Sequence, residues 1–226
     1  MTDHNDFIED VDDPSDELGY SEYDWDQLSE EEVDLHNDVI SMDEAEVLDL
    51  DLKSLTDLQK WAAAQVLFDA DNDMGLDLVE QILFGDRKHP ALDYLAIAVE
   101  FCYDYVMEDQ LEKARKVLGA VHDLADPDDS IALELEAMIL FAEGEEAKSM
   151  AKYQEVIDDY GDDAEVLLNI ASHFGMFGIM DRANELVDQA ETLALADNSE
   201  DAKELVELIK EFRVRLNEED EEGIDA

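Results

Sequence analysis

Apolar residues recur with helical spacing from residue 54 onward, and short turn signals separate each such stretch from the next. The turn signals, most of which contain Asp, Gly or Pro, fall at residues 71–75, 85–90, 108–109, 126–129, 144, 161–163, 178 and 197–199. They predict about nine helices, and no stretch shows a convincing strand pattern. Because the connections are short, consecutive helices should pack as antiparallel neighbours. The sequence therefore predicts an all-α fold.

Residues 1–53 show a different pattern, with runs of acids and few aliphatic side chains. They contain 21 acids and a single base, Lys53. Such a segment buries too little apolar surface to offset the entropy of ordering, so we expect it to be disordered. Two capping boxes, Ser29 with Glu32 and Ser41 with Glu44, predict short transient helices within it.

Four apolar side chains stand among the acids of this predicted tail. They are Tyr20, Tyr23, Trp25 and Leu28. An acidic-aromatic pattern of this kind is typical of segments that bind other proteins. The alternative is a solvated tail in which the aromatic residues are incidental.

The helical part of the chain repeats itself with an offset of 34 residues. Equivalent pairs are Gly144 and Gly178, Leu133 and Leu167, Ala137 and Ala171, Leu140 and Phe174, Tyr153 and Val187, and Val156 and Ala190. This period belongs to solenoids of helix–turn–helix units, in which each unit buries its apolar face against its neighbour. Residues 164–193 resemble the tetratricopeptide repeat, with Leu167, Ile170, Ala171 and Phe174 in the first helix and Ala183, Val187 and Ala190 in the second.

The resemblance to the tetratricopeptide family extends over about four units and a capping helix. The second unit carries Phe101, Cys102 and Tyr105 at the matching positions. The third unit departs from the family at Glu136 and Ser149, where an apolar residue and an alanine are usual. The predicted organisation is a disordered acidic tail at 1–53, a repeat array at 54–198, a capping helix at 199–217 and an acidic C-terminal tail at 218–226.

In the tetratricopeptide family, the first helix of each unit lines a concave groove in which ligands lie. Carried over to this sequence, the resemblance implies a groove lined by Trp61, Phe68, Val99, Glu100, Tyr103, Met107, Leu135, Met138, Phe141, Leu168, Asn169 and Met176. An apolar groove that contains methionines and is ringed by acids suits an extended peptide with hydrophobic anchors and basic flanks. A register error of one residue would instead make several of these side chains part of the core.

A second candidate site lies in the first unit, where oxygen ligands follow the spacing of an EF-hand calcium loop. The residues are Asp69, Asp71, Asp73, Asp77 and Glu80. The sixth loop position needs a glycine for its sharp turn, but Met74 stands there and Gly75 follows one place late. The alternative is an acidic turn between two repeat helices.

The charge of the chain excludes several functions. The sequence has 65 acids against 14 bases, which leaves a formal net charge of -51. Binding to nucleic acid or to an anionic membrane needs clustered Lys and Arg, so we expect neither. The longest apolar run, at 137–142, is far too short to span a membrane. The single cysteine, Cys102, fits a reducing compartment, and we expect a cytoplasmic protein.

The sequence offers no arrangement that points to catalysis. Its five histidines are scattered without metal-ligand spacing, and no phosphate loop or nucleophile elbow occurs. We therefore expect no enzyme and no cofactor. The leading hypothesis is a protein-interaction adaptor or chaperone, whose groove holds a partner segment while the acidic tail attracts basic surfaces. The other hypotheses are an acidic decoy that mimics nucleic acid and a calcium-responsive protein that uses residues 69–80.

Overall fold

The computed structural model describes residues 28–223, except 71, 87–88, 128 and 198; for residues 200, 201 and 217–223 it describes the backbone only. The helices are α1 (Glu30–Ile40), α2 (Glu44–Leu48), α3 (Asp57–Asp69), α4 (Met74–Phe84), α5 (Tyr94–Met107), α6 (Leu111–Leu124), α7 (Ile131–Ala142), α8 (Glu146–Tyr160), α9 (Ala164–Met176), α10 (Met180–Ala196) and α11 (Glu200–Gly223). No β-strand occurs among the described residues, so the all-α prediction is confirmed.

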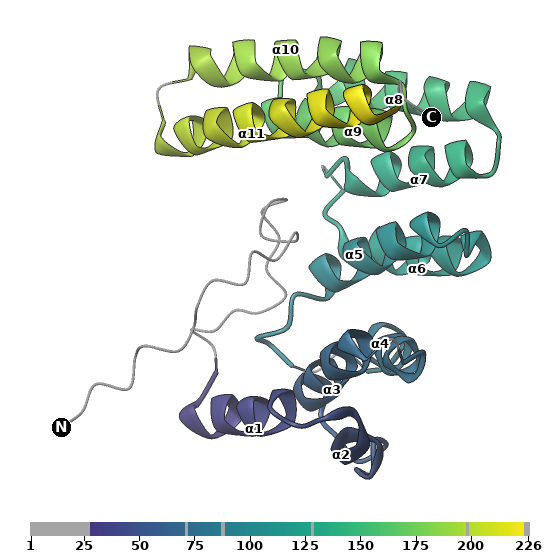
Figure 1. Cartoon of the computed structure of the whole chain (residues 1–226), viewed down its shortest axis with the longest axis vertical. Coiled ribbons are helices and arrows are strands. Elements are labelled where there is room, and N and C mark those ends of the chain that lie inside the picture. The colour runs from purple at the N-terminus through teal and green to yellow at the C-terminus, as the bar shows by residue number, and fades with distance from the viewer. Residues whose placement is uncertain (1–27, 71, 87–88, 128, 198, 224–226) are drawn as a thin grey trace.

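The helices from α3 to α10 form four antiparallel hairpins that stack into a curved array (Figure 1). The hairpins are α3 with α4, α5 with α6, α7 with α8, and α9 with α10. Helix α11 packs against α9 and α10 at the end of the array. Figure 1 shows an arc that is open on one side, with α1 and α3 on one arm and α9, α10 and α11 on the other. This is a solenoid like that of tetratricopeptide proteins, with four units and a capping helix.

The turn between the two helices has the same backbone in three of the four units. Asp109, Gly144 and Gly178 each adopt a positive φ, of 59°, 78° and 70°. The amide that follows each of them bonds a carbonyl five residues back, in the pairs Gln110 to Tyr105 at 2.7 Å, Glu145 to Leu140 at 2.9 Å and Ile179 to Phe174 at 2.8 Å. This left-handed helix ending favours glycine, which two of the units supply. The same turn geometry therefore recurs 35 residues after Asp109 and 34 residues after Gly144.

Two clusters of buried apolar side chains hold the array together. The first core cluster extends from α1 to α7, and in it the rings of Trp61 and Phe101 meet edge to face at 5.9 Å. The second core cluster extends from α7 to α11, and in it Tyr153 and Phe174 meet edge to face at 4.9 Å. Helix α7 contributes side chains to both clusters. Each unit therefore buries its apolar face against the next, as a solenoid requires.

Residues 28–53 are folded, so the prediction that all of residues 1–53 are disordered is wrong for this part. Helices α1 and α2 both pack against α3, and they bury Val39 and Val47 in the first core cluster. Helix α3 carries apolar residues nearly all around, and α1 and α2 cover part of its surface. The local sequence of residues 28–53 is rich in acids and does not reveal that this segment packs against α3. Residues 1–27 lie outside the described residues, and their disorder stays a prediction.

The starts of α1 and α2 and the end of α11 show where the predicted helix boundaries hold and where they differ. The capping box of Ser29 and Glu32 is confirmed, with reciprocal hydrogen bonds of 3.3 and 2.9 Å. The second box uses Asp43 and Glu46, two residues later than predicted. Helix α11 continues to Gly223, so the predicted end of the capping helix at residue 217 is too early.

Candidate protein-binding surface

Five of the twelve predicted groove residues belong to the core, since none of them is more than 7% exposed. The five are Trp61, Val99, Leu135, Met138 and Leu168. Their prediction as groove residues is therefore wrong. Side chains of neighbouring units reach past α7 and help to cover it: Tyr103 of α5 bonds His173 of α9, and Phe177 stacks on Phe141.

The other seven predicted groove residues remain partly or largely accessible. They are Phe68, Glu100, Tyr103, Met107, Phe141, Asn169 and Met176. Met107 is 64% exposed and Met176 is 39% exposed, the highest values in the group. Phe68 is partly a core residue, because its ring lies against Gly75 and 5.3 Å from the ring of Phe101. The accessible part of the predicted groove therefore comes mainly from α5, α7 and α9.

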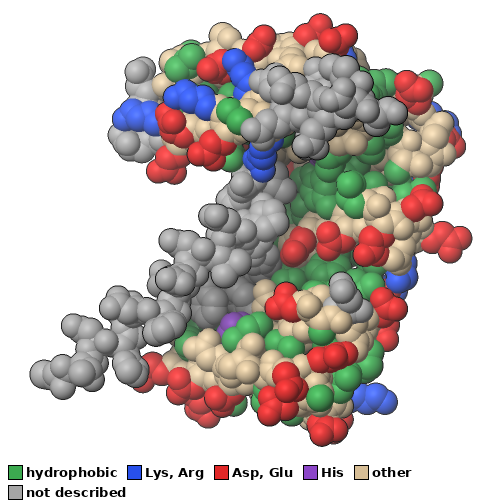
Figure 2. Space-filling view, viewed as in Figure 1, with side chains coloured by type: hydrophobic (Ala, Val, Ile, Leu, Met, Phe, Trp, Pro, Cys, Tyr) green, Lys and Arg blue, Asp and Glu red, His purple; other side chains and the backbone are tan. Residues whose placement is uncertain are grey.

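Four accessible apolar side chains lie at one edge of the array, and we call them the apolar row. Met107, Phe141 and Met176 stand in the last turns of α5, α7 and α9, and Phe177 directly follows α9. The rings of Phe141 and Phe177 are stacked, with centroids 4.1 Å apart. Because these helices are the first helices of successive units and run in the same direction, their last turns share an edge. The hydrophobic side chains that Figure 2 shows along the inner side of the arc are a separate feature, because the turn that follows α7 lies on the opposite, closed side of the arc in Figure 1.

Sequence reasoning missed Phe177 in this row. The residue immediately precedes Gly178, which the sequence marks as a turn, and it is not among the predicted groove residues. Its position as the C-terminal cap of α9 is what brings it within reach of α7. The usual signal of a glycine-terminated helix would not have found it, because the hydrophobic residue of that motif follows the glycine and is here Ile179.

A buried histidine connects three units beside this surface. The hydroxyl oxygen of Tyr103 lies 2.5 Å from Nε2 of His173, and that of Tyr153 lies 3.0 Å from Nδ1. Burial lowers the pKa of His173 to about 3, so the ring is neutral near pH 7. A neutral imidazole has one donor and one acceptor, so one tyrosine donates to the ring and the other accepts from it. The network joins α5, α8 and α9, and thereby fixes the second, third and fourth units relative to one another.

A buried carboxylic acid lies in α7, at Glu134, whose side chain is 1% exposed. The hydroxyl of Ser130 donates to one carboxylate oxygen, and the other oxygen has no hydrogen-bond partner among the described residues. Burial is the main cause that raises the pKa of Glu134 to about 7, and the charges of Asp129 and Asp163 add to it. Ser130 and the side chain of Asn169 oppose the shift. Glu134 therefore changes protonation near neutral pH.

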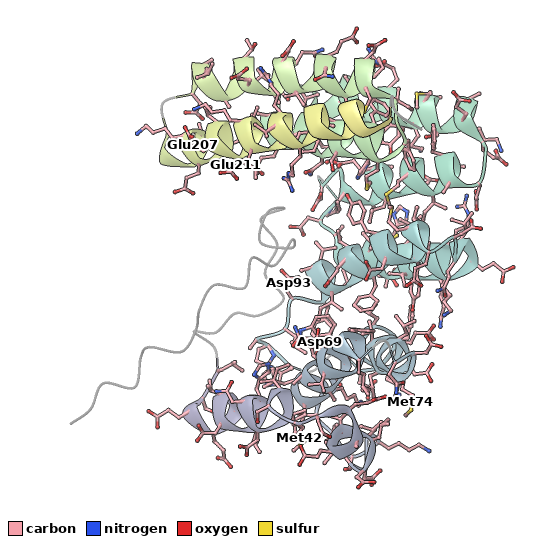
Figure 3. The ribbon with its side chains drawn as sticks, viewed as in Figure 1. Met42, Asp69, Met74, Asp93, Glu207 and Glu211 are labelled. Atoms are coloured by element: carbon pink, nitrogen blue, oxygen red, sulfur yellow. The ribbon has the colours of Figure 1, made fainter. Side chains whose placement is uncertain are left out.

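The described part of the predicted calcium loop forms two helices and the turn between them. Helix α3 ends at Asp69 and α4 begins at Met74, both labelled in Figure 3. Asp77 and Glu80 are therefore helical. Glu80 pairs with a lysine of α6 at 2.7 Å. Among the described residues, no group of three or more His, Cys, Asp or Glu side chains could hold a metal ion. Asp71 lies outside the described residues. This geometry fits the alternative interpretation, an acidic turn between repeat helices.

Only one residue of the predicted tail motif belongs to the described part of the chain. Leu28 is half-buried and packs against the first core cluster. Tyr20, Tyr23 and Trp25 lie outside the described residues. In the part of the chain that the structure describes, no helix has both the length and the apolar character that crossing a bilayer requires.

Comparisons with known proteins leave the function to be argued from this geometry. No protein-family model and no curated protein matches the sequence. Among solved structures, the chain is similar to MamA MSR-1 C2, with 16% identity, a TM-score of 0.43, and coverage of 73% of this chain and 97% of that one. It is similar in the same way to MamA D159K mutant 1, with 16% identity, a TM-score of 0.42, and coverage of 72% and 97%. A likeness this low carries no argument about function.

Proposed function

We propose that this chain is a protein-interaction adaptor or chaperone, which binds a segment of a partner protein along the edge of the array that carries the apolar row. The apolar row is the observation that supports this most. Two exposed methionines, Met107 and Met176, flank the stacked rings of Phe141 and Phe177. Burial of one such side chain contributes roughly 1.5 to 3 kcal/mol, and a micromolar complex needs about 8 kcal/mol. A few hydrophobic anchors on this row would therefore supply much of such an affinity.

The charges beside the row indicate the chemistry of the partner. Glu100 and Asp104 lie one turn apart on α5, and Glu108 caps the end of the helix directly after Met107. Partial desolvation, together with the charge of Glu108, raises the pKa of Asp104, although the residue itself is exposed. A Lys or Arg of the partner beside these carboxylates would favour their ionised form. We infer a partner segment that carries hydrophobic anchors and basic flanks, to which the acidic tail adds long-range attraction.

The test is a pair of charge-introducing double variants. Met107→Glu with Met176→Glu places two charges on the apolar row. Leu195→Glu with Val214→Glu is the matched control, because Leu195 and Val214 are 65% and 56% exposed outside the row. Partners are crosslinked and purified from native lysate with the full chain, and affinity is then measured with the purified partner. We expect the row variant to bind at least roughly 100-fold more weakly, since two anchors are lost.

Two outcomes would contradict this proposal. If the row variant and the control variant bind the partner equally well, the row is not the binding surface. If the row variant binds normally but about 0.5 M salt abolishes binding, exposed charge carries the interaction, because salt at that level screens charges within a few ångströms. The acidic decoy would then be the better explanation. Circular dichroism of both variants shows whether they remain folded.

A further inference from the structure

An open groove lies between α4 and α6, at the junction of the first two units, and we call it the α4–α6 groove. It has a volume of about 490 Å³ and is lined by Asp77, Glu80, Gln81, Phe84, Gly85 and Lys116. Ligand pockets typically measure about 300 to 1,000 Å³, so the groove is large enough to hold a side chain of another protein. The lining combines two carboxylates and an ammonium group with an accessible aromatic ring, since Phe84 is 43% exposed.

The groove already holds one cation of the chain itself. Nζ of Lys116 lies 2.7 Å from a carboxylate oxygen of Glu80 and 4.4 Å from the centroid of the Phe84 ring. A carboxylate and an aromatic face are both good partners for ammonium and guanidinium groups. Because both members of the Lys116–Glu80 pair reach solvent, the pair contributes little to stability. A cation of another molecule can therefore replace Lys116 at small cost.

A buried hydroxyl group without a partner lies close to the groove. Tyr105 is 1% exposed, and its hydroxyl oxygen makes no hydrogen bond with the described residues. Burial, and then the charges of four carboxylates, raise the pKa of this hydroxyl to about 12; the carboxylates belong to Glu80, Glu108, Asp104 and Asp77. The hydroxyl therefore stands among acids of α4 and α5. A buried polar group that lacks a partner at such a place indicates that a group from outside the chain completes it.

The charge around Tyr105 indicates what this group is. The cations that face its four carboxylates are Lys116 and Lys113, whose Nζ lies 5.1 Å from the centroid of the Tyr105 ring. Negative charge therefore remains in excess. Among the described residues no group of acids is arranged to hold a metal ion, so the matching cation is one that carries N–H donors. Arginine fits best, because its planar guanidinium has five such donors and also stacks on aromatic rings.

The acids beside the groove also adjoin the apolar row. Met107, the first member of the row along the chain, is followed directly by Glu108, and Asp104 lies one turn before Glu108. Both of these acids act on the Tyr105 hydroxyl as well. A segment whose hydrophobic anchor lies on Met107 therefore brings its neighbouring residues to the acids beside the α4–α6 groove.

We propose that the α4–α6 groove receives an arginine side chain of the partner segment, next to the anchor that lies on Met107. The guanidinium takes the place of the Lys116 ammonium on the ring of Phe84. Its N–H groups donate to the carboxylates of Asp77 and Glu80 and to the hydroxyl oxygen of Tyr105. This inference rests on the proposed function, because it adds one position to the same partner segment. It is tested with a probe that has no hydrophobic anchor, so the outcome does not depend on the row.

The experiment is fluorine NMR of the full chain labelled with 4-fluorophenylalanine, in which Phe84→Leu assigns the Phe84 signal. The probe is Nα-acetyl-arginine amide, and Nα-acetyl-citrulline amide has nearly the same shape without the charge. We expect the arginine probe to shift the Phe84 signal saturably and the citrulline probe to leave it in place. Lys116→Met removes the competing cation, so this variant should bind the arginine probe severalfold more tightly. Lys148→Met, which removes a cation of α8, should not.

Asp77→Asn with Glu80→Gln removes both carboxylates of the groove and should weaken binding of the arginine probe about tenfold. The matched control is Asp181→Asn with Glu185→Gln on α10, where Glu185 likewise pairs with a cation at 2.7 Å, that of Arg182. This control should change probe binding little. The proposal is overturned if the Phe84 signal does not shift saturably, or if the control weakens binding as much as the groove variant does.

An equal response of Phe84 to the citrulline probe, or to Nα-acetyl-lysine amide, also overturns the choice of arginine. Each of these outcomes leaves the apolar row, and therefore the proposed function, intact. Conversely, equal binding of the partner by the row variant and its control would contradict the proposed function without altering the response of Phe84 to the probe.

Discussion

The third unit, α7 with α8, and the fourth unit, α9 with α10, are related by the offset of 34 residues, and both turn at a glycine with positive φ. They differ in which position holds an ionisable side chain. Glu134 of α7 corresponds to Leu168 of α9, and His173 of α9 corresponds to Ile139 of α7; all four side chains are buried. The partners differ as well, because Glu134 accepts from Ser130 at the start of its own helix, whereas His173 bonds tyrosines of α5 and α8.

The two groups make stability depend on pH in opposite directions. The folded pKa of His173, about 3, is below its ordinary 6.5, so its contribution is present above pH 6.5 and is lost as pH falls. The folded pKa of Glu134, about 7, is above its ordinary 4.5, so its contribution is complete below pH 4.5 and is lost as pH rises through 7. Between pH 4.5 and 6.5 the two effects oppose each other.

The largest expected effect comes from replacing His173 of the fourth unit with an aliphatic residue, as the third unit has at Ile139. His173→Leu removes the partner of the buried Tyr153 hydroxyl and one bond of Tyr103, and a buried hydroxyl left unsatisfied costs about 1 to 3 kcal/mol. We expect the free energy of unfolding at pH 7.5 to fall by roughly 2 to 4 kcal/mol. Below pH 6.5 the difference from the unaltered chain should shrink, because only the unaltered chain must bury a neutral histidine. Urea unfolding at several pH values measures both quantities.

Tyr153→Phe provides the control for this variant. In the His173→Leu background it removes one unsatisfied hydroxyl, so it should recover part of the lost stability, whereas alone it should destabilise. If His173→Leu is as stable as the unaltered chain at pH 7.5, the network does not hold the three units together.

The second-largest expected effect comes from removing the ionisable group of Glu134, which the third unit buries where the fourth unit has Leu168. Glu134→Gln keeps the shape and the ability to accept from Ser130 but cannot ionise. At pH 8 we expect the variant to be more stable by roughly 2 to 3 kcal/mol, because each unit of pKa shift corresponds to about 1.4 kcal/mol. At pH 4.5 the gain should vanish. Thermal or urea unfolding at both pH values measures the difference.

Glu136→Gln is the matched control, since it removes the same charge two residues away. Glu136 is half-exposed and pairs with Lys152 at 3.3 Å, so its loss should change stability little or lower it slightly. An equal gain from both variants at pH 8 would mean that the general negative charge of the chain, rather than the burial of Glu134, is responsible.

The hairpins could be predicted from the sequence because their signals are local. The glycines at 144 and 178 mark positions that need positive φ, and the apolar residues between turns recur at helical spacing. The contacts of His173 could not be predicted in this way. Its partners, Tyr103 and Tyr153, are 70 and 20 residues away in sequence, and only the curvature of the array brings them together.

The groove could be predicted only in part, for a physical reason that α7 illustrates. This helix carries apolar residues on nearly every side, so no single stripe distinguishes the core from an accessible surface. Leu135 and Met138 were assigned to the groove from the family register, but both are fully buried. Which sides of such a helix are covered depends on its neighbours, and the local pattern does not contain that information.

The smallest expected effect extends the comparison to the second unit, where Asp109 occupies the turn position that is glycine in the third and fourth units. A residue with a Cβ atom is disfavoured at positive φ, although Asp tolerates it better than most. Asp109→Gly removes this cost, but glycine loses more conformational entropy on folding, so we expect a net gain of only roughly 0.3 to 1 kcal/mol. The change also removes a negative charge next to Glu108.

Asp109→Asn separates these two contributions, because it removes the charge while keeping a side chain that tolerates positive φ. Asp109→Ala removes the charge but tolerates that backbone poorly, so it should be the least stable of the three variants. We therefore expect stability to decrease in the order Gly, Asn, Ala, as measured by the midpoint of urea unfolding. If Gly and Asn are equally stable, the gain comes from charge alone. The second unit would then tolerate its non-glycine turn without strain, and the repeated turn would not depend on glycine for its stability.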